Sequence, residues 1–273
     1  MRPETIDLYL LRRFSLPVEL RSLLKRYLYD KITNRNIRYA VLNTPLTAIL
    51  YGPLESWDTS AVTDMSFLFM HHRHFNTDIS NWDVSNVRSM NRLFYKAIRF
   101  NQPIGKWNVS NVRDMDQMFS WAHSFNQPLN DWDVSKVIGM YSMFSAALVF
   151  NQPLDKWDVS QVVTTEEMFK DAILFNQPIT SWNLTNVRSL REMFSGALSF
   201  CQEVKSTKYP KEESRHNMML DAISFGCERQ PYKFLVRNLL NPFLSLFVKG
   251  IITSARVMGR IYWKLFREKN ASS

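Results

Sequence analysis

The chain has 273 residues, of which 45% are apolar and 14% aromatic, so it can bury a substantial continuous core. Seven glycines and 22% charged residues exclude an intrinsically disordered protein. The formal charge of +9 is uneven: residues 1–50 and 227–273 carry an excess of Lys and Arg, whereas residues 51–226 hold sixteen basic against nineteen acidic residues. We therefore expect an anionic partner to meet the flanks rather than the middle.

The first fifty residues predict a helical N-terminal cap. Apolar residues at spacings of three and four trace one face of a helix: Leu16, Leu20, Leu23, Leu24, Tyr27 and Leu28. Residues 36–50 favour one or two shorter helices interrupted at Pro45. Residues 16–20, LPVEL, also resemble the opening of an F-box, a helical module that docks substrate receptors onto a ubiquitin ligase. A cap and a docking module therefore both stay open for residues 1–50.

Residues 51–226 repeat at a fixed period of 25. Tryptophan recurs in six successive cycles: Trp57, Trp82, Trp107, Trp132, Trp157 and Trp182. Phenylalanine recurs from Phe69 to Phe194, and alanine from Ala97 to Ala222. A period of this length is typical of stacked repeats that bury a continuous core between neighbours. We expect six clear coils and a degenerate seventh.

Each 25-residue cycle contains two spacing patterns of apolar residues, one typical of a strand and one typical of a helix. Ile104, Trp107 and Val109 predict a short strand. Apolar residues from Val112 to Ala122 then recur at spacings of three and four, which predicts a short helix. Ser110 would cap that helix. The turn that begins at Asn101 recurs in each coil, so we expect stacked asparagines to hydrogen-bond neighbouring turn backbones.

The repeated motif F-N-Q-P-I/L-x-x-W-D/N-V-S-x-V-x-x-M-x-x-M-F-x-x-A resembles the BspA-like leucine-rich repeat family, which includes mycoplasma surface lipoproteins. The resemblance covers about residues 51–225. It implies an α/β solenoid, a right-handed stack of strand–helix coils that binds other proteins, often on a cell surface. Together with the flanks, the predicted fold is such a solenoid of about 25-residue coils between helical N- and C-terminal caps.

Residues 227–273 predict a basic amphipathic helical segment. The longest uncharged stretch there has eleven residues, short of the roughly 20 that span a bilayer. Basic residues fall on one helical face and could contact an anionic membrane or another anion: Lys249, Arg256, Arg260, Lys264 and Arg267. The same segment could serve only as a C-terminal cap. Because no secretory apolar run follows Arg12 and Arg13, we expect an intracellular, cytoplasmic protein, with a membrane-associated or cell-surface location as the alternative.

The sequence predicts no catalytic, cofactor-binding or metal-binding residues. His71, His72 and His74 cluster in a variable turn, but no acidic or cysteine partner lies at suggestive spacing. Cys201 and Cys227 are expected to be two reduced, partly buried thiols. Neither a nucleic acid nor a small-molecule substrate is expected as a partner.

Recognition is predicted where successive coils differ, immediately before each tryptophan. This pre-tryptophan column consists of Ser56, Asn81, Lys106, Asp131, Lys156 and Ser181. Through it, a non-enzymatic interaction scaffold would bind a protein partner whose identity the sequence does not give. The alternatives are a ubiquitin-ligase substrate adaptor that docks through the F-box-like segment, and a peripheral membrane or cell-surface protein anchored by the basic C-terminal helix.

Overall fold

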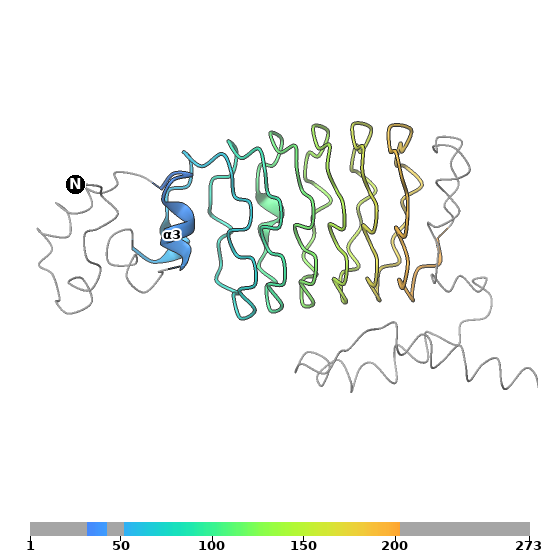
Figure 1. Cartoon of the computed structure of the whole chain (residues 1–273), viewed down its shortest axis with the longest axis horizontal. Coiled ribbons are helices and arrows are strands. Elements are labelled where there is room, and N and C mark those ends of the chain that lie inside the picture. Colours follow the sequence, from blue (N-terminus) through green and yellow to red (C-terminus); the bar gives the residue numbers. More distant parts are fainter. Residues whose placement is uncertain (1–31, 43–51, 203–273) are drawn as a thin grey trace, which may run out of the picture.

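The computed structural model describes residues 32–42 and 52–202, which form a row of stacked coils behind one short helix (Figure 1). We number the coils by their 25-residue cycles, from coil 1 (51–75) to coil 6 (176–200). The helix α3 (Ile37–Leu42) lies beside coil 1. Two 3-10 helices complete the regular elements of the described residues, η2 (Leu54–Ser56) and η3 (Ile104–Lys106).

The predicted α/β solenoid is wrong. Among residues 32–42 and 52–202, consecutive coils pair through isolated parallel bridges, such as Ser89 with Asp114, and no strand forms. The stretch expected as a strand begins in coil 3 with η3, because the Trp107 N–H donates back to the Ile104 carbonyl over 3.1 Å. The predicted helical caps are not shown either: the described part of the N-terminal cap holds one six-residue α-helix, and the rest of that cap and the whole of the predicted C-terminal cap lie outside the described residues.

In place of the predicted helix, each coil has a ladder segment, which in coil 3 runs from Asp114 to Ala122. Its backbone N–H groups alternate between two kinds of partner. Met115 and Gln117 donate to coil 4 over 2.9 and 2.7 Å, whereas Met118 donates to the carbonyl three residues earlier over 3.2 Å. Successive turns of this kind bury residues at spacings of three and four, as a helix does. The burial pattern therefore agreed with the sequence although the backbone did not.

Left-handed backbone makes this alternation possible. Two residues in every ladder segment have positive φ, for example Gln117 at 55° and Trp121 at 62°. Gln117 lies at the third position of a four-residue turn, which the Met118 N–H closes by donating to the Met115 carbonyl. A type II turn needs positive φ at this third position. Such backbone costs a non-glycine residue about 1–2 kcal/mol. Its recurrence in all six coils shows that the bonds between coils outweigh that cost.

The core is a set of aromatic columns along the row of coils. The phenylalanines at the Phe119 position stack on the next coil at centroid distances of 5.5–5.6 Å. All six repeat tryptophans are at most 4% exposed. From Trp82 onward each indole N–H donates to a carbonyl of the preceding coil, as Trp132 does to Ile104 over 3.2 Å. The interior phenylalanines therefore pack against the coils on both sides, and each indole from Trp82 onward also hydrogen-bonds the backbone of the preceding coil.

The predicted asparagine ladder is confirmed. The Asn126 N–H donates to the Asn101 Oδ1 over 2.9 Å, and the Gln127 amide donates to the Asn101 carbonyl over 3.1 Å. The same pair of bonds recurs down to Cys201 and Gln202. Cys201 is disulfide-bonded, so the expectation of a reduced thiol there is wrong. Cys227 lies outside the described residues.

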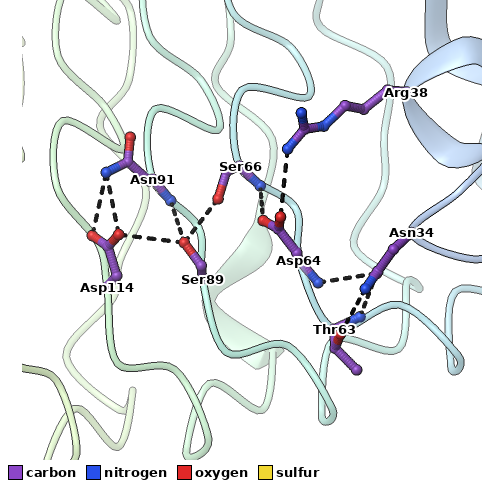
Figure 2. Close-up of polar contacts among 8 residues, drawn as sticks. All are labelled: Asn34, Arg38, Thr63, Asp64, Ser66, Ser89, Asn91 and Asp114. Atoms are coloured by element: carbon purple, nitrogen blue, oxygen red, sulfur yellow. Dashed lines mark hydrogen bonds and ion pairs between the residues drawn. The ribbon is translucent and has the colours of Figure 1, made fainter.

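The segment before coil 1 occupies the open edge of the first ladder segment (Figure 2). The Asn34 Oδ1 accepts the N–H groups of Thr63 and Asp64 over 2.8 and 3.1 Å, and Arg38 pairs with Asp64 at 3.5 Å. Ile37, in α3, is fully buried in the same hydrophobic cluster as the coils. The Asn34 side chain thus accepts the hydrogen bonds of two backbone N–H groups that would otherwise need an acceptor in a preceding coil.

Candidate functional site

The pre-tryptophan column is exposed in every coil that the structure describes. Lys156 reaches Asp131 of the preceding coil at 2.7 Å, and this hydrogen bond raises the Lys156 pKa above its usual value. Both side chains of this pair are more than 60% exposed. Solvent screens such an exposed pair, so it contributes little, and no aromatic residue belongs to the column. Its role in recognition stays a prediction.

The residues that follow each tryptophan have a structural role. Asp133 accepts the Ser135 N–H over 3.1 Å and the Ser135 hydroxyl over 2.6 Å, and these bonds lower the Asp133 pKa. The corresponding Asp or Asn accepts the same backbone donor in all six coils. These bonds close a turn in each coil, and within residues 52–202 no helix begins after Ser110, so the predicted helix cap at Ser110 is wrong.

A second surface, the ladder face, is formed by five side-chain positions of each ladder segment, most of which are half-buried and some of which are buried. None of these residues belongs to the continuous hydrophobic cluster. Their identities change from coil to coil: Asp64, Ser66, Phe67, Met70 and His71 in coil 1; Ser89, Asn91, Arg92, Tyr95 and Lys96 in coil 2; Asp114, Asp116, Gln117, Ser120 and Trp121 in coil 3; Gly139, Tyr141, Ser142, Ser145 and Ala146 in coil 4; Thr164, Glu166, Glu167, Lys170 and Asp171 in coil 5; Ser189, Arg191, Glu192, Ser195 and Gly196 in coil 6.

Aromatic and cationic side chains alternate across coils 1 to 3 of this face. The guanidinium groups of Arg38 and Arg92 lie 5.7 and 5.6 Å from the centre of the Phe67 ring. The Lys96 ammonium lies 5.1 Å from Tyr95 and 5.8 Å from Trp121. Phe67 and Trp121 are 38% and 41% exposed, which is unusual for residues of this size. We call these six residues the aromatic–cation row: Arg38, Phe67, Arg92, Tyr95, Lys96 and Trp121.

Polar bonds between coils fix the backbone beneath this row (Figure 2). The Ser66 and Ser89 hydroxyls lie 2.8 Å apart, and the Asn91 amide donates to the Asp114 carboxylate over 3.2 Å. Arg92 Nε donates to the Gln117 amide oxygen over 2.5 Å. The cations and rings of the row are therefore presented from a rigid support, which reduces the entropy lost when a partner orders them.

The other end of the ladder face is acidic. Glu166, Glu167 and Asp171 stand against one cation in coil 5, Lys170. Lys170 pairs with Glu167 at 2.8 Å and with Glu192, and its side chain is only 12% exposed. Coil 5 therefore carries a net negative charge on this face, whereas coil 2, with Arg92 and Lys96, carries a net positive charge.

Burial shifts the pKa values of three titratable groups on or near this face. Burial raises the pKa of Asp116 to about 6, although the Tyr141 N–H donates to its carboxylate over 2.8 Å. Burial lowers the pKa of His123 to about 4 and that of His72 below its usual value. His71 is exposed and its ring meets Tyr95 edge-on at 5.5 Å. Within the described residues, no group of three or more His, Cys, Asp or Glu could hold a metal ion.

Sequence reasoning did not single out the ladder face, because its residues were assigned to a helix. A signal was present: the Asp116 and Trp121 positions, on either side of the invariant Phe119 position, hold a different residue in each of the six coils. Most of the F-box-like segment lies outside the described residues. The five basic residues expected to contact a membrane or another anion also lie outside them: Lys249, Arg256, Arg260, Lys264 and Arg267. No helix in residues 32–42 and 52–202 is long and apolar enough to cross a bilayer.

A comparison with curated proteins finds no match. The sequence profile of one family matches the chain twice, over residues 42–152 and 127–230. Both matches fall on the stacked coils, and together they cover well over half of the chain. The chain therefore belongs to the family described as Mycoplasma protein of unknown function, DUF285.

Proposed function

We propose that this chain is a non-enzymatic interaction scaffold that binds a protein partner through the ladder face. The observation that carries the proposal is the aromatic–cation row, in which Phe67 and Trp121 stay about 40% exposed beside three cations. Trp, Tyr and Arg are the residues that most often dominate binding energy at protein interfaces. The stacked coils hold these residues on rigid backbone, as such an interface requires.

The ladder face supports this role better than the pre-tryptophan column. Burying one exposed aromatic ring of 150–250 Å², of which about 40% is available, removes roughly 60–100 Å² from water, or about 2 kcal/mol. The exposed pair of Lys156 and Asp131 contributes little, because solvent screens it. A partner that covers Phe67 and Trp121 therefore gains more than one that covers the column.

A relationship to the BspA-like leucine-rich repeat proteins is part of this proposal. It is supported by the repeated F-N-Q-P and W-D/N-V-S motifs, and such proteins bind other proteins. The adaptor and membrane-anchor alternatives depend on residues 14–50 and 244–267, almost all of which lie outside the described residues.

Affinity capture with two matched triple variants tests the proposal. The intact chain identifies its bound proteins first. Replacing Phe67, Tyr95 and Trp121 with alanine should reduce capture of the same protein by at least about tenfold. Replacing Lys106, Asp131 and Lys156 with alanine should leave capture within about threefold, because exposed charge pairs contribute little. Circular dichroism confirms that both variants are folded. If only the second variant lost its partner, the pre-tryptophan column would be the binding face, and if neither did, the proposal would fail.

A further inference from the structure

We propose that the partner of the ladder face is a second copy of this chain, bound around a two-fold axis that passes between coils 3 and 4. This inference rests on the proposed function, because it assigns the occupant of the same face. In a two-fold interface the same surface is used twice, so that if residue i meets residue j, then j also meets i. With the axis running across the coils between coils 3 and 4, coil 2 of one copy faces coil 5 of the other, and coil 3 faces coil 4.

Charge complementarity is the first support. The ladder face of coil 2 carries two cations and no acid, Arg92 and Lys96, whereas that of coil 5 carries three acids and one cation. At equal register Lys96 would face Asp171, and Arg92 would face Glu167. Both contacts occur twice by symmetry. Opposite charges that meet at an interface favour the correct encounter and fix its register.

Side-chain size gives an independent match at the centre. Trp121 is 41% exposed in coil 3, while the same register position of coil 4 holds Ala146, flanked by Ser142 and Ser145. The side chains of these three residues are small and at most 7% exposed, so nothing long projects there. Under the proposed axis each Trp121 would lie over the partner's small residues. Fully desolvated tryptophans near the centre of an interface are the commonest energetic hot spots.

The repeat geometry makes these contacts simultaneous. Both copies have the same spacing between coils, about 4.8 Å for backbone-paired chains, so one correct pair brings all the others into register. The coils lie in a nearly straight row, which lets two such faces meet along their length (Figure 1). A face about 29 Å long, from six coils at this spacing, belongs to the smaller class of interfaces, so we expect a micromolar dimer.

Other two-fold arrangements bring like charges together. If the axis ran along the row instead, each coil would face its own equivalent with its positions in reverse order, so that an axis through the Arg92 position would place Arg92 against Arg92 and Glu167 against Glu167. An axis through coil 3 would place Asp116 against itself, and an axis through coil 4 would place it against Glu166. Like charges at an interface cost several kcal/mol. The axis between coils 3 and 4 faces Asp116 with Tyr141 and creates no such pair at equal register.

Exchange of residues between the facing positions tests the inference on the full chain. Trp121→Ala removes the projecting ring and Ala146→Trp places a second ring against it, so each should weaken dimerisation about tenfold or more. The double variant Trp121→Ala with Ala146→Trp should regain most of the affinity, because the ring then projects from coil 4 onto coil 3. The fold should tolerate both changes, since this left-handed position already holds Trp, Lys, Asp, His, Ala and Gly in different coils.

A charge exchange gives a second, independent cycle. Lys96→Asp and Asp171→Lys should each weaken the dimer, and the pair together should restore it, while the control Lys106→Asp should have no effect. Sedimentation velocity from micromolar to millimolar concentration measures each dissociation constant. Carbodiimide crosslinking of mixed isotope-labelled and unlabelled chains should join Lys96 of one copy to Asp171 of the other.

A chain that stays monomeric up to millimolar concentration would overturn the inference, and so would double variants that fail to recover. Neither result affects the proposed function, which fails only if the Phe67, Tyr95 and Trp121 variant captures its partner undiminished. A dimer whose two exchange cycles both recover would support the inference and the proposed function together.

Discussion

At the scale of single residues, Asp116 shows how the coil stack changes ordinary chemistry. Its carboxylate lies between coils 3 and 4, where its Oδ1 accepts the Tyr141 N–H, and a β-carbon added at Gly139 would come within 2.7 Å of it. Burial is the main cause that raises its pKa to about 6, and the nearby Asp114 adds to the effect. The folded chain therefore holds a proton on this group more tightly than the unfolded chain does.

Asp116→Asn should remove a pH dependence of stability. Because the folded pKa of about 6 exceeds the unfolded value of 3.8, the stability that this group contributes is complete below pH 3.8 and is lost as the pH rises through 6. The variant should match the wild type near pH 3.5 and exceed it at pH 7 by about 1 kcal/mol, since partial exposure reduces the full effect. Urea unfolding at several pH values measures this difference.

Asp133→Asn is the control of opposite sign. The Ser135 hydroxyl and N–H lower the Asp133 pKa, so its contribution is present at neutral pH and is lost as the pH falls through the folded pKa. The wild type should be the more stable protein at pH 7, and the difference should vanish in acid. An Asp116→Asn profile that runs parallel to the wild type would contradict the raised pKa.

At the scale of elements, a coil is held by contacts that a local secondary structure does not explain. Half of the ladder-segment donors in coil 3 bond within the coil, and the others bond to coil 4. The Trp132 indole bonds in the opposite direction, to the Ile104 carbonyl of coil 3. Each coil is therefore completed by its two neighbours, and one in isolation would leave these groups unpaired.

Trp132→Phe should destabilise the chain by about 1–3 kcal/mol. The substitution keeps a buried aromatic ring but removes the indole donor of the Ile104 carbonyl, which then keeps only the Trp107 N–H, and leaves a void where the larger ring lay. Trp121→Phe is the matched control, because that ring is 41% exposed, and it should change stability by less than about 0.5 kcal/mol. Urea unfolding measures the loss of stability in both variants. Equal losses would show that the indole hydrogen bond contributes nothing.

The sequence predicted the burial pattern well and the backbone poorly, and one physical reason explains both. Val112, Met115, Phe119 and Ala122 are fully buried as expected, because side-chain burial follows spacing, and turns closed over three residues share the spacing of a helix. The ladder segment differs from a helix in two ways: alternate N–H groups donate to the next coil, and Gln117 and Trp121 have positive φ. Neither residue type signals a left-handed conformation, so no local pattern could have revealed it.

The same error displaced the candidate site. Because residues 112–122 were predicted to form a helix, recognition was predicted at the pre-tryptophan column, which includes Lys106 and Asp131, and Trp121 was not among the candidate residues. The alternation of Arg92, Tyr95 and Lys96 with rings from other coils depends on contacts between residues about 25 apart. Such contacts follow from the repeat length only when the position of each residue on its coil is known.

At the scale of the whole molecule, the described chain is a series of equivalent interfaces. The bonds made by the Asn101, Trp107 and Met115 positions recur between successive coils. Stability in such arrays is approximately a sum over coils and nearest-neighbour contacts. Any uninterrupted set of whole coils should therefore retain the same internal packing.

Deletion of residues 126–150 should leave a folded protein. Phe125 would then precede Asn151, which could donate its N–H to Asn101 as Asn126 does now, and Trp157 could reach the Ile104 carbonyl. We expect cooperative thermal unfolding, measured by circular dichroism, at a somewhat lower temperature than in the full chain. Deletion of residues 126–138 shifts the register of every later coil and should abolish the transition. Loss of cooperativity in both deletions would show that the coils are not equivalent.

The constant coil length also bears on how such a gene can change. Where neighbouring coding units share a length and much of their sequence, unequal recombination adds or removes whole units in frame. Each product carries matching aromatic rings and asparagines at the new junction, as Phe125 and Asn126 do at the present one. Lineages can therefore vary the reach of this protein through single genetic events, without passing through misfolded intermediates.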